Sequence, residues 1–202
     1  KGETHTTVNV LDAILSSFKK ASHVFVVESD NYRGKGNERL QIWKELYSEK
    51  VTPFNLSEDS DTRKVKIAGE EIALSHLLFK PSVLVSTHVV RSFDVGSVLK
   101  NLLGLIPDKK KARFHKKLET TLLDAYEAVG GIDLAVLDGT YLYSGAGTVP
   151  KAGVNSARYR ARTDTLIVGR DAVAVETVGA VLAGLDPERV PVIQEAVKRG
   201  LG

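Results

Sequence analysis

Short apolar runs of strand length alternate with segments of helical periodicity along this chain, and the alternation restricts its fold more than any other feature. Three runs, at positions 24–27, 83–86 and 134–137, are largely apolar and show no alternation of polar residues. Such runs are typical of strands that are buried on both faces. The apolar residues between the runs recur at three and four positions, as on one face of a helix. We therefore predict an α/β fold with a mostly parallel, doubly wound sheet and helices on both faces.

One stretch departs from this alternation and predicts a small β-hairpin insertion. The segments 64–67 and 71–74 flank Ala68, Gly69 and Glu70, a short connection of the kind that joins antiparallel strands. Upstream, the strand candidate 51–56 contains Pro53, which has no N–H to donate and therefore favours an edge position. The sequence thus predicts a minor antiparallel element beside the main sheet.

The composition is that of one globular domain, which we place over residues 1–202. Hydrophobic residues make up 43% and charged residues 26% of the chain, proportions that suit a buried core. Methionine is absent, including an initiator, so we expect a processed chain or a fragment that lacks an N-terminal strand. No stretch approaches the roughly 20 apolar residues of a membrane span, and the polar start differs from a secretory leader. We therefore predict a cytoplasmic protein without membrane association.

Cysteine is also absent, which excludes several kinds of site within these residues. The chain can form no disulfide, no thiolate zinc site and no protein-ligated iron–sulfur cluster. The net charge of +3 is too small to identify a nucleic-acid-binding protein. The cofactor stays unknown from composition alone, with a divalent metal as the candidate.

Ligands of doubly wound sheets bind outside the carboxyl ends of the strands, and this rule selects four short segments. They are residues 28–31, 87–88, 138–139 and 169–171. Asp138 could bind a metal, act as a base or cap the Asp-Gly turn that it begins. His88 could join a second histidine and an aspartate as a metal ligand, or it could be a structural residue.

Basic residues are concentrated in one stretch between positions 100 and 117, where Asp108 is the single acid. The seven basic residues are Lys100, Lys109, Lys110, Lys111, Arg113, Lys116 and Lys117. Such a stretch is either a solvated surface or an anion-binding site, and its closeness to His115 is compatible with anion binding. Further along the chain, Gly145 and Gly147 could cradle an anion with backbone N–H groups or mark a surface turn.

The segment 98–107, followed at short distance by Lys111 and His115, resembles part of a known family. This is the widespread, uncharacterised conserved family called domain of unknown function 362, whose members carry a Lys-Asn-Leu-x-Gly segment and then a lysine and a histidine. Further similar segments follow in chain order: 134–139, Gly145 and Gly147 with Pro150 and Gly153, 168–176, 184–187 and 200–202. The resemblance extends from near residue 5 to the end of the chain.

Two departures from the family pattern bear on function. Many members have Lys-Thr-His where this chain has Ser86, Thr87 and His88. Many relatives also carry ferredoxin-type cysteine clusters, which are absent here. The resemblance supplies no reaction, and a fold does not define one, so whether the chain is an enzyme stays open.

The resemblance joins individually unremarkable residues into one candidate set for binding a small anionic ligand, with a divalent metal as a second component. The ligand-binding candidates are His88, Lys100, Asn101, Lys111, His115, Gly145 and Gly147. The candidate metal ligands are Asp138, Asp171 and Glu176, whose oxygens suit a hard cation. Lys100 and His115 are the pair expected to matter most, because the helix stop at Pro107 reverses the chain between them.

Two functions from other classes stay open. The ferredoxin domains of relatives and the basic stretches favour a non-enzymatic docking partner of an iron–sulfur protein, with a small, salt-sensitive interface. Arg158, Arg160 and Arg162, interleaved with Tyr159, could instead bind single-stranded nucleic acid. These arginines alternate, so in a strand they would share one solvated face. The low net charge makes nucleic acid the less favoured partner.

Overall fold

The computed structural model describes residues 6–32, 34–92, 96–143 and 160–202. The chain divides into two compact units. Unit 1 comprises residues 1–11, 83–101 and 131–202, and unit 2 comprises residues 12–82 and 102–130. Helix α1 (Val8–Ser17) begins in unit 1 and ends in unit 2, and the 3₁₀ helix η3 (Lys100–Leu105) also crosses the boundary.

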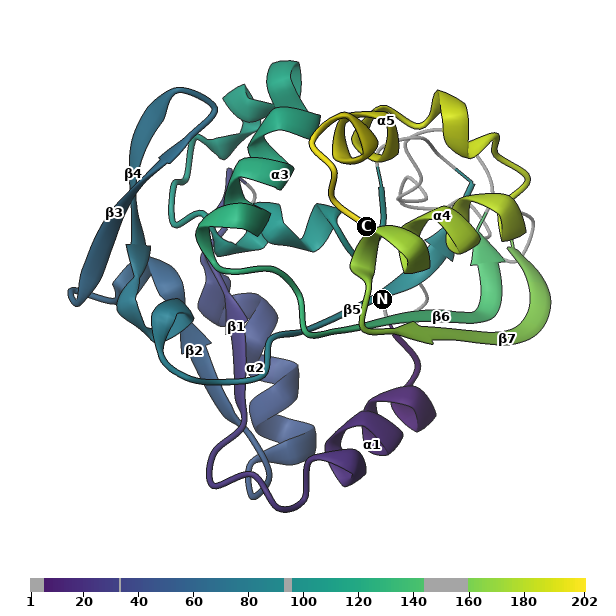
Figure 1. The fold of residues 1–202 in the computed structure, drawn as a ribbon. Coiled ribbons are helices and arrows are strands. Elements are labelled where there is room, and N and C mark those ends of the chain that lie inside the picture. Colours follow the sequence, from purple (N-terminus) through teal and green to yellow (C-terminus); the bar gives the residue numbers. More distant parts are fainter. Residues whose placement is uncertain (1–5, 33, 93–95, 144–159) are drawn as a thin grey trace. The chain divides into compact units, whose positions relative to one another are not determined.

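Unit 1 is built on a three-stranded sheet in the order β5-β6-β7 (Figure 1). Strands β5 (Val85–Arg91) and β6 (Leu134–Tyr143) are parallel, whereas β7 (Arg160–Gly169) runs antiparallel to β6. Helix α4 (Ala172–Leu182) packs on this sheet. Gly179 allows α4 to lie close to the sheet, because a Cβ atom at position 179 would be only 2.2 Å from Leu137 Cδ2.

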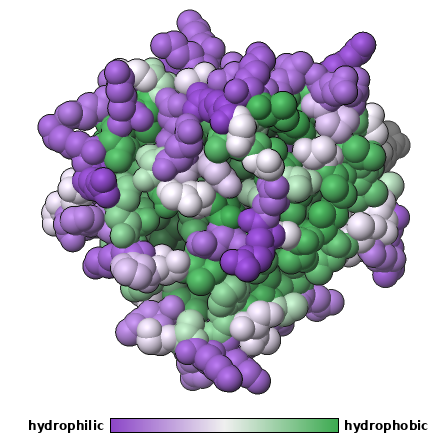
Figure 2. Space-filling model, viewed as in Figure 1, coloured by the Kyte–Doolittle hydropathy of each residue, from purple (hydrophilic) through white to green (hydrophobic). Residues whose placement is uncertain are grey.

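The remaining elements of unit 1 complete its core beside α4. The 3₁₀ helix η6 (Pro187–Arg189) leads into α5 (Pro191–Lys198), which contacts α4. The inward-facing residues of these elements are almost fully buried: Leu137, Ala172, Val175, Val192, Ile193 and Ala196. The face that appears in Figure 2 nevertheless carries apolar side chains over α4 and β7, where Leu166, Val168, Val178 and Val181 are exposed.

Unit 2 contains a parallel pair of strands joined by a helix. Strand β1 (Phe25–Glu28) pairs in parallel with β2 (Thr52–Asn55), and α2 (Gly36–Tyr47) connects them and packs on both. Gly36 allows the start of α2 to approach β2, because a Cβ atom there would lie 2.7 Å from Asn55 Oδ1. Pro53 lies in β2, which is an edge strand of this described pair, as the sequence predicts.

A β-hairpin packs against a helix in the same unit. Strands β3 (Thr62–Ile67) and β4 (Glu70–Ser75) are antiparallel, which confirms the predicted hairpin. Ala68 and Gly69 both have positive φ, as a tight hairpin turn requires. The turn is held by α3 (Leu118–Ala128), because Asp124 accepts a 2.7 Å hydrogen bond from the Ala68 N–H. Short 3₁₀ helices complete unit 2: η1 (Leu56–Glu58), η2 (His76–Phe79) and η4 (Lys111–Lys117).

The predicted mixture of helices and strands is confirmed, but a single doubly wound sheet is not. The described strands form three small sheets, of which one is parallel, one antiparallel and one mixed. The segment before Pro107 forms the 3₁₀ helix η3, and the helical segment after it is divided between η4 and α3. Among the described residues, no helix has both the length and the apolar character needed to cross a membrane.

Candidate functional site

Two charged clusters lie at carboxyl ends of parallel strands, one in each unit. The first, which we call the Arg91 cluster, consists of Arg91, Lys100 and Asn101 in unit 1. The second, which we call the Lys111 cluster, gathers around Lys111 in unit 2. Their positions agree with the general rule that ligands of α/β proteins bind outside the carboxyl ends of strands.

Arg91 is placed by the parallel pairing of β5 with β6. It is the last residue of β5 and lies opposite Tyr143, the last residue of β6. The next residue continues this pairing, because the Ser92 N–H donates a 2.8 Å hydrogen bond to the Tyr143 carbonyl oxygen. The Arg91 side chain is half-buried. The guanidinium group therefore originates at the carboxyl ends of both parallel strands.

The start of η3, which carries Lys100, is attached by Asn101 to β5, the strand that carries Arg91. The Asn101 amide donates hydrogen bonds to the Thr87 carbonyl oxygen at 2.7 Å and to Ser86 Oγ at 3.1 Å, so the start of η3 is attached to β5. Burial lowers the pKa of Lys100, and the positive charge of Arg91 lowers this pKa further. Burial also lowers the pKa of Arg91. Two half-buried cations thus lie within electrostatic range of each other.

His88 and His115, the two histidines of the predicted set, make local contacts with backbone carbonyls. His88 is half-buried on β5, and its Nδ1 lies 2.9 Å from the Val89 carbonyl oxygen. His115 is exposed on η4, with Nδ1 2.9 Å from the Ala112 carbonyl oxygen. Lys100 belongs to unit 1 and His115 to unit 2, and the expected pairing of these two residues stays a prediction. Gly145 and Gly147 lie outside the described residues.

The three candidate metal ligands accept hydrogen bonds from backbone N–H groups. Asp138 accepts from the N–H of Thr7 at 2.7 Å and from the N–H and hydroxyl of Thr140 at 2.9 and 2.7 Å. Burial raises the pKa of Asp138, but these hydrogen bonds bring it below its ordinary value. Asp171 caps α4 by accepting from two N–H groups of its first turn, both at 2.9 Å. Glu176, also on α4, accepts from the N–H groups of Ser97 and Leu99.

A metal site at these carboxylates stays a prediction. In the part of the chain that the structure describes, no group of three or more His, Asp and Glu side chains is arranged to hold a metal ion. The hydrogen bonds of Asp138, Asp171 and Glu176 supply a structural reason for each of these acids.

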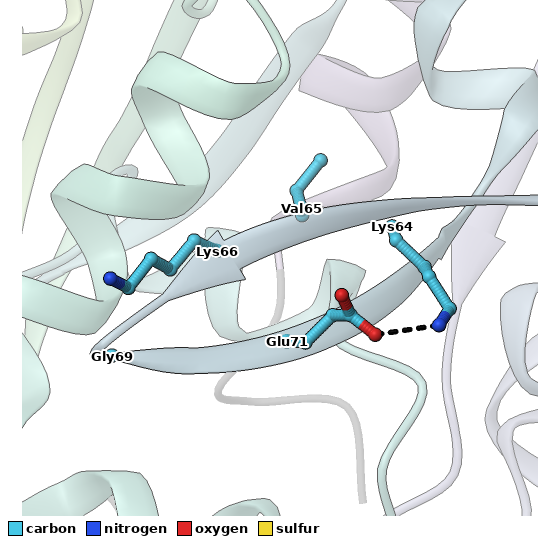
Figure 3. A pocket seen from close by; sticks show the side chains of 5 residues that line it. All are labelled: Lys64, Val65, Lys66, Gly69 and Glu71. Carbon is cyan, nitrogen blue, oxygen red and sulfur yellow. Dashed lines mark ion pairs between the residues drawn. The ribbon is translucent and has the colours of Figure 1, made fainter.

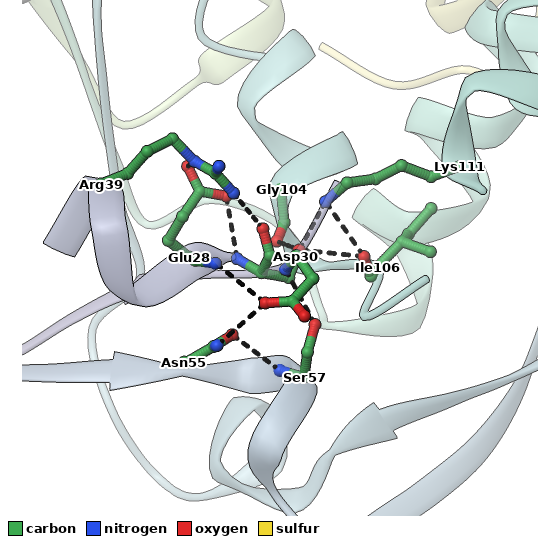
Figure 4. Close-up of polar contacts among 10 residues, drawn as sticks. Glu28, Asp30, Arg39, Asn55, Ser57, Gly104, Ile106 and Lys111 are labelled. Atoms are coloured by element: carbon green, nitrogen blue, oxygen red, sulfur yellow. Dashed lines mark hydrogen bonds and ion pairs between the residues drawn. The ribbon is translucent and has the colours of Figure 1, made fainter. Parts of the chain in front are cut away.

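Lys111, a predicted ligand-binding residue, lies in the interior of unit 2 (Figure 4). It is only 5% exposed, and its Nζ donates to Ser29 Oγ at 2.5 Å and to the Ile106 carbonyl oxygen at 3.2 Å. Burial lowers the pKa of Lys111 to about 8, against the opposing effect of Glu28. Ser29, which follows β1 directly, also lies 2.9 Å from the Ile106 carbonyl oxygen. Lys111 therefore connects the end of β1 to the chain around residue 106.

Acids and amides complete the Lys111 cluster at the ends of β1 and β2. Arg39 of α2 donates to the Ser29 carbonyl oxygen and forms a 3.2 Å ion pair with Glu28. Asp30 is 5% exposed and accepts from the N–H of Gly36 at 2.8 Å and from the Asn55 amide at 3.0 Å. These hydrogen bonds lower the pKa of Asp30. The cluster is thus a dense network in which each charged group has polar partners.

A cleft of about 700 Å³ lies beside this network in unit 2. Asp30 and Ser57 line it from the ends of β1 and β2, and Lys109 approaches Asp30 with Nζ 3.6 Å from Oδ2. Arg113, also on its wall, pairs with Glu70 at 2.8 Å and with Asp108 at 2.5 Å. A smaller hollow of about 260 Å³ lies on the β3–β4 hairpin, beside the ion pair of Lys64 with Glu71 (Figure 3). The lining of the larger cleft carries more acidic than basic side chains, so this cleft is not a site for an anion.

Sequence reasoning missed Arg91 and gave no role to Ser29 and Asp30. The strand predicted over 83–86 extends in the structure from Val85 to Arg91, so its carboxyl end lies several residues further along the chain. Val89 and Val90, both β-branched, could have indicated this extension. Ser29 and Asp30 belong to the predicted segment 28–31, but only the fold shows that Lys111 meets them.

The basic residues considered for nucleic-acid binding lie in part on β7. Arg160 stacks on the Tyr141 ring at 4.7 Å, and Arg162 forms a 2.8 Å ion pair with Asp164. Arg158 and Tyr159 lie outside the described residues. The contacts of Arg160 and Arg162 within β6 and β7 are those expected of a strand surface, and nucleic-acid binding stays a prediction without a supporting contact.

The two parallel strand pairs and the charged clusters at their ends define an α/β protein with its polar groups concentrated at strand ends. The chain belongs to the family described as domain of unknown function (DUF362), whose sequence model matches residues 1–181. This result confirms the resemblance found in the sequence. No curated protein and no solved structure matches the chain. Function has therefore to be argued from the clusters themselves.

Proposed function

We propose that this protein binds a small anionic molecule at the carboxyl ends of β5 and β6, through Arg91 and Lys100. The observation that carries the proposal is a pair of half-buried cations in one unit: burial lowers the pKa of Lys100, and the positive charge of Arg91 lowers this pKa further. Two cations in a partly buried environment repel each other, and an anion bound near both would interact favourably with each of them. Asn101 supports the same geometry, because its two hydrogen bonds to β5 fix the backbone next to Lys100.

The two side chains favour a phosphate-bearing ligand over a singly charged one. A guanidinium group presents a planar fork of N–H donors that matches phosphate oxygens, and an ammonium group supplies a compact point charge. Partial burial strengthens both interactions relative to those at a fully hydrated surface. The proposed ligand requires no divalent metal. The carboxylates of Asp138, Asp171 and Glu176 accept hydrogen bonds from backbone N–H groups.

Replacing either cation is expected to weaken the binding of inorganic phosphate by at least tenfold, since a charge-assisted hydrogen bond contributes roughly 1.5–3 kcal/mol. Lys100→Ala and Arg91→Ala would be compared with wild type by calorimetric titration with phosphate at low ionic strength. Thermal stability should change little in Lys100→Ala, because the substitution also removes the repulsion from Arg91.

Lys198→Ala is the matched control for this experiment. Lys198 is exposed at the end of α5 in the same unit, and its substitution changes the net charge by the same amount. The phosphate affinity of the Lys198→Ala variant should equal that of wild type. The proposal is wrong if wild type binds no phosphate, or if Lys198→Ala weakens binding as much as Lys100→Ala does.

A further inference from the structure

Glu176 is a buried acid whose carboxylate binds the chain segment that leads into Lys100. Its side chain extends from the second turn of α4, and the residue is 3% exposed. The Ser97 N–H donates to Oε1 at 2.6 Å, and the Leu99 N–H donates to Oε2 at 3.0 Å. Each carboxylate oxygen therefore receives a backbone donor, and the two donors lie two residues apart on one segment.

The segment 96–99 is buried along its whole length and follows the carboxylate closely. Val98 and Leu99 are 0% exposed. Gly96 has a φ of 84°, and a Cβ atom there would lie 3.3 Å from Val192 Cγ1 and 3.8 Å from the Glu176 carboxyl carbon. A larger residue would be strained at that position by both its backbone conformation and its neighbours. The chain is thus shaped to pass next to Glu176.

A second attachment holds the same segment to the sheet. The Ser86 hydroxyl donates a 2.7 Å hydrogen bond to the Val98 carbonyl oxygen, and it also accepts from the Asn101 amide at 3.1 Å. The residues just before Lys100 are therefore held by α4 through Glu176 and by β5 through Ser86. The backbone on both sides of Lys100 has a defined position relative to β5, the strand that carries Arg91.

We infer that Glu176 is a positioning residue for the proposed anion site: it fixes the 97–99 segment and thereby the position of Lys100 relative to β5, the strand that carries Arg91. The inference rests on the proposed function for its biological meaning and on the contacts of Glu176 for its geometry. A carboxylate is required because the two N–H donors converge on one group, and each needs an acceptor oxygen. Glutamine has one acceptor oxygen, so its NH₂ group would face a backbone N–H.

Glu176→Gln is expected to loosen the segment that leads into Lys100 without removing either cation. The direct readout is the pKa of Lys100, measured by NMR titration of protein with ¹³C-methylated lysines, with the Lys100 signal assigned from Lys100→Arg. As the side chain becomes hydrated and moves away from Arg91, its pKa should rise toward the ordinary value of 10.5. Phosphate affinity should fall by about tenfold, as expected for loss of one charge-assisted contact.

Val175→Ala is the control for loss of stability alone. Val175 is 3% exposed and adjacent to Glu176 on α4, and its truncation removes core packing but no hydrogen bond to the 97–99 segment. The pKa of Lys100 and the phosphate affinity should match wild type in this variant. If Val175→Ala shifts the pKa of Lys100 as much as Glu176→Gln does, any weakening of α4 has the same effect, and the inference is overturned.

Glu176→Asp covers the case in which Glu176→Gln does not fold. Aspartate retains both acceptor oxygens on a shorter side chain, so the pKa of Lys100 should shift in the same direction by a smaller amount. An unchanged pKa of Lys100 in whichever of these variants folds would overturn the inference. If the pKa of Lys100 shifts but wild type binds no phosphate, the positioning role stands and the proposed ligand is wrong.

Discussion

Asp138→Ala is expected to lower the free energy of unfolding by about 3 kcal/mol, since an unsatisfied buried polar group costs roughly 1–3 kcal/mol and several donors lose their acceptor. Asp138 is 1% exposed and lies in the centre of β6. Its carboxylate holds the N–H groups of Thr7 and Thr140 and the hydroxyl of Thr140. The substitution therefore detaches the start of α1 from the sheet of unit 1. Urea denaturation monitored by circular dichroism would measure the loss.

Asp171→Ala provides the comparison, because both aspartates are candidate metal ligands in the sequence. Asp171 is exposed and caps α4, so water can replace it and the loss should be about 1 kcal/mol, as is usual for a helix cap. If Asp138 and Asp171 act only as hydrogen-bond acceptors, treating wild type with a chelator leaves its unfolding curve unchanged. A chelator that destabilises wild type as much as Asp138→Ala does would support the metal site instead.

Asp138 and Asp171 show which properties of a site can be predicted from a sequence and which cannot. Asp138 follows an apolar run, and that pattern predicted the end of a strand and a turn at this position. The prediction of a strand end is wrong, because β6 continues through Asp138 to Tyr143. A carboxylate in such a place can satisfy a cation or a backbone N–H equally well. The choice depends on Thr7, which lies 131 positions earlier in the chain. No local pattern contains that contact, so the role of Asp138 could not be decided from the sequence.

Parts of the fold that depend on local contacts were predictable from the sequence, and parts that depend on distant contacts were not. The hairpin was predictable because Ala68 and Gly69 form a local turn between two short strands. The antiparallel direction of β7 was not, because it depends on pairing with β6 rather than on any property of its own residues. Likewise, Lys111 was identified only as a member of a basic stretch. Its burial against Ser29 comes from a contact across 82 positions.

The burial of Lys111 should make the free energy of unfolding of the protein rise with pH in the alkaline range. The pKa of Lys111 falls from 10.5 in the unfolded chain to about 8 in the folded protein. Below pH 8 both states bind the proton, so the full cost of the buried charge is present. Between these values only the unfolded chain retains the proton, and the free energy of unfolding increases with pH. The difference of 2.5 pH units corresponds to about 3 kcal/mol.

Lys111→Met tests this linkage, because methionine has a similar length and no charge. The free energy of unfolding of the variant minus that of wild type should decrease by about 3 kcal/mol between pH 7.5 and 10.5, since each pKa unit corresponds to roughly 1.4 kcal/mol. Other titrating groups contribute equally to both proteins and cancel in this difference. Lys116→Met, which alters an exposed residue of the same η4 helix, should differ from wild type by a nearly constant amount. Parallel pH profiles for Lys111→Met and wild type would show that Lys111 is hydrated in solution, and the Lys111 cluster would then not be the closed network that Figure 4 shows.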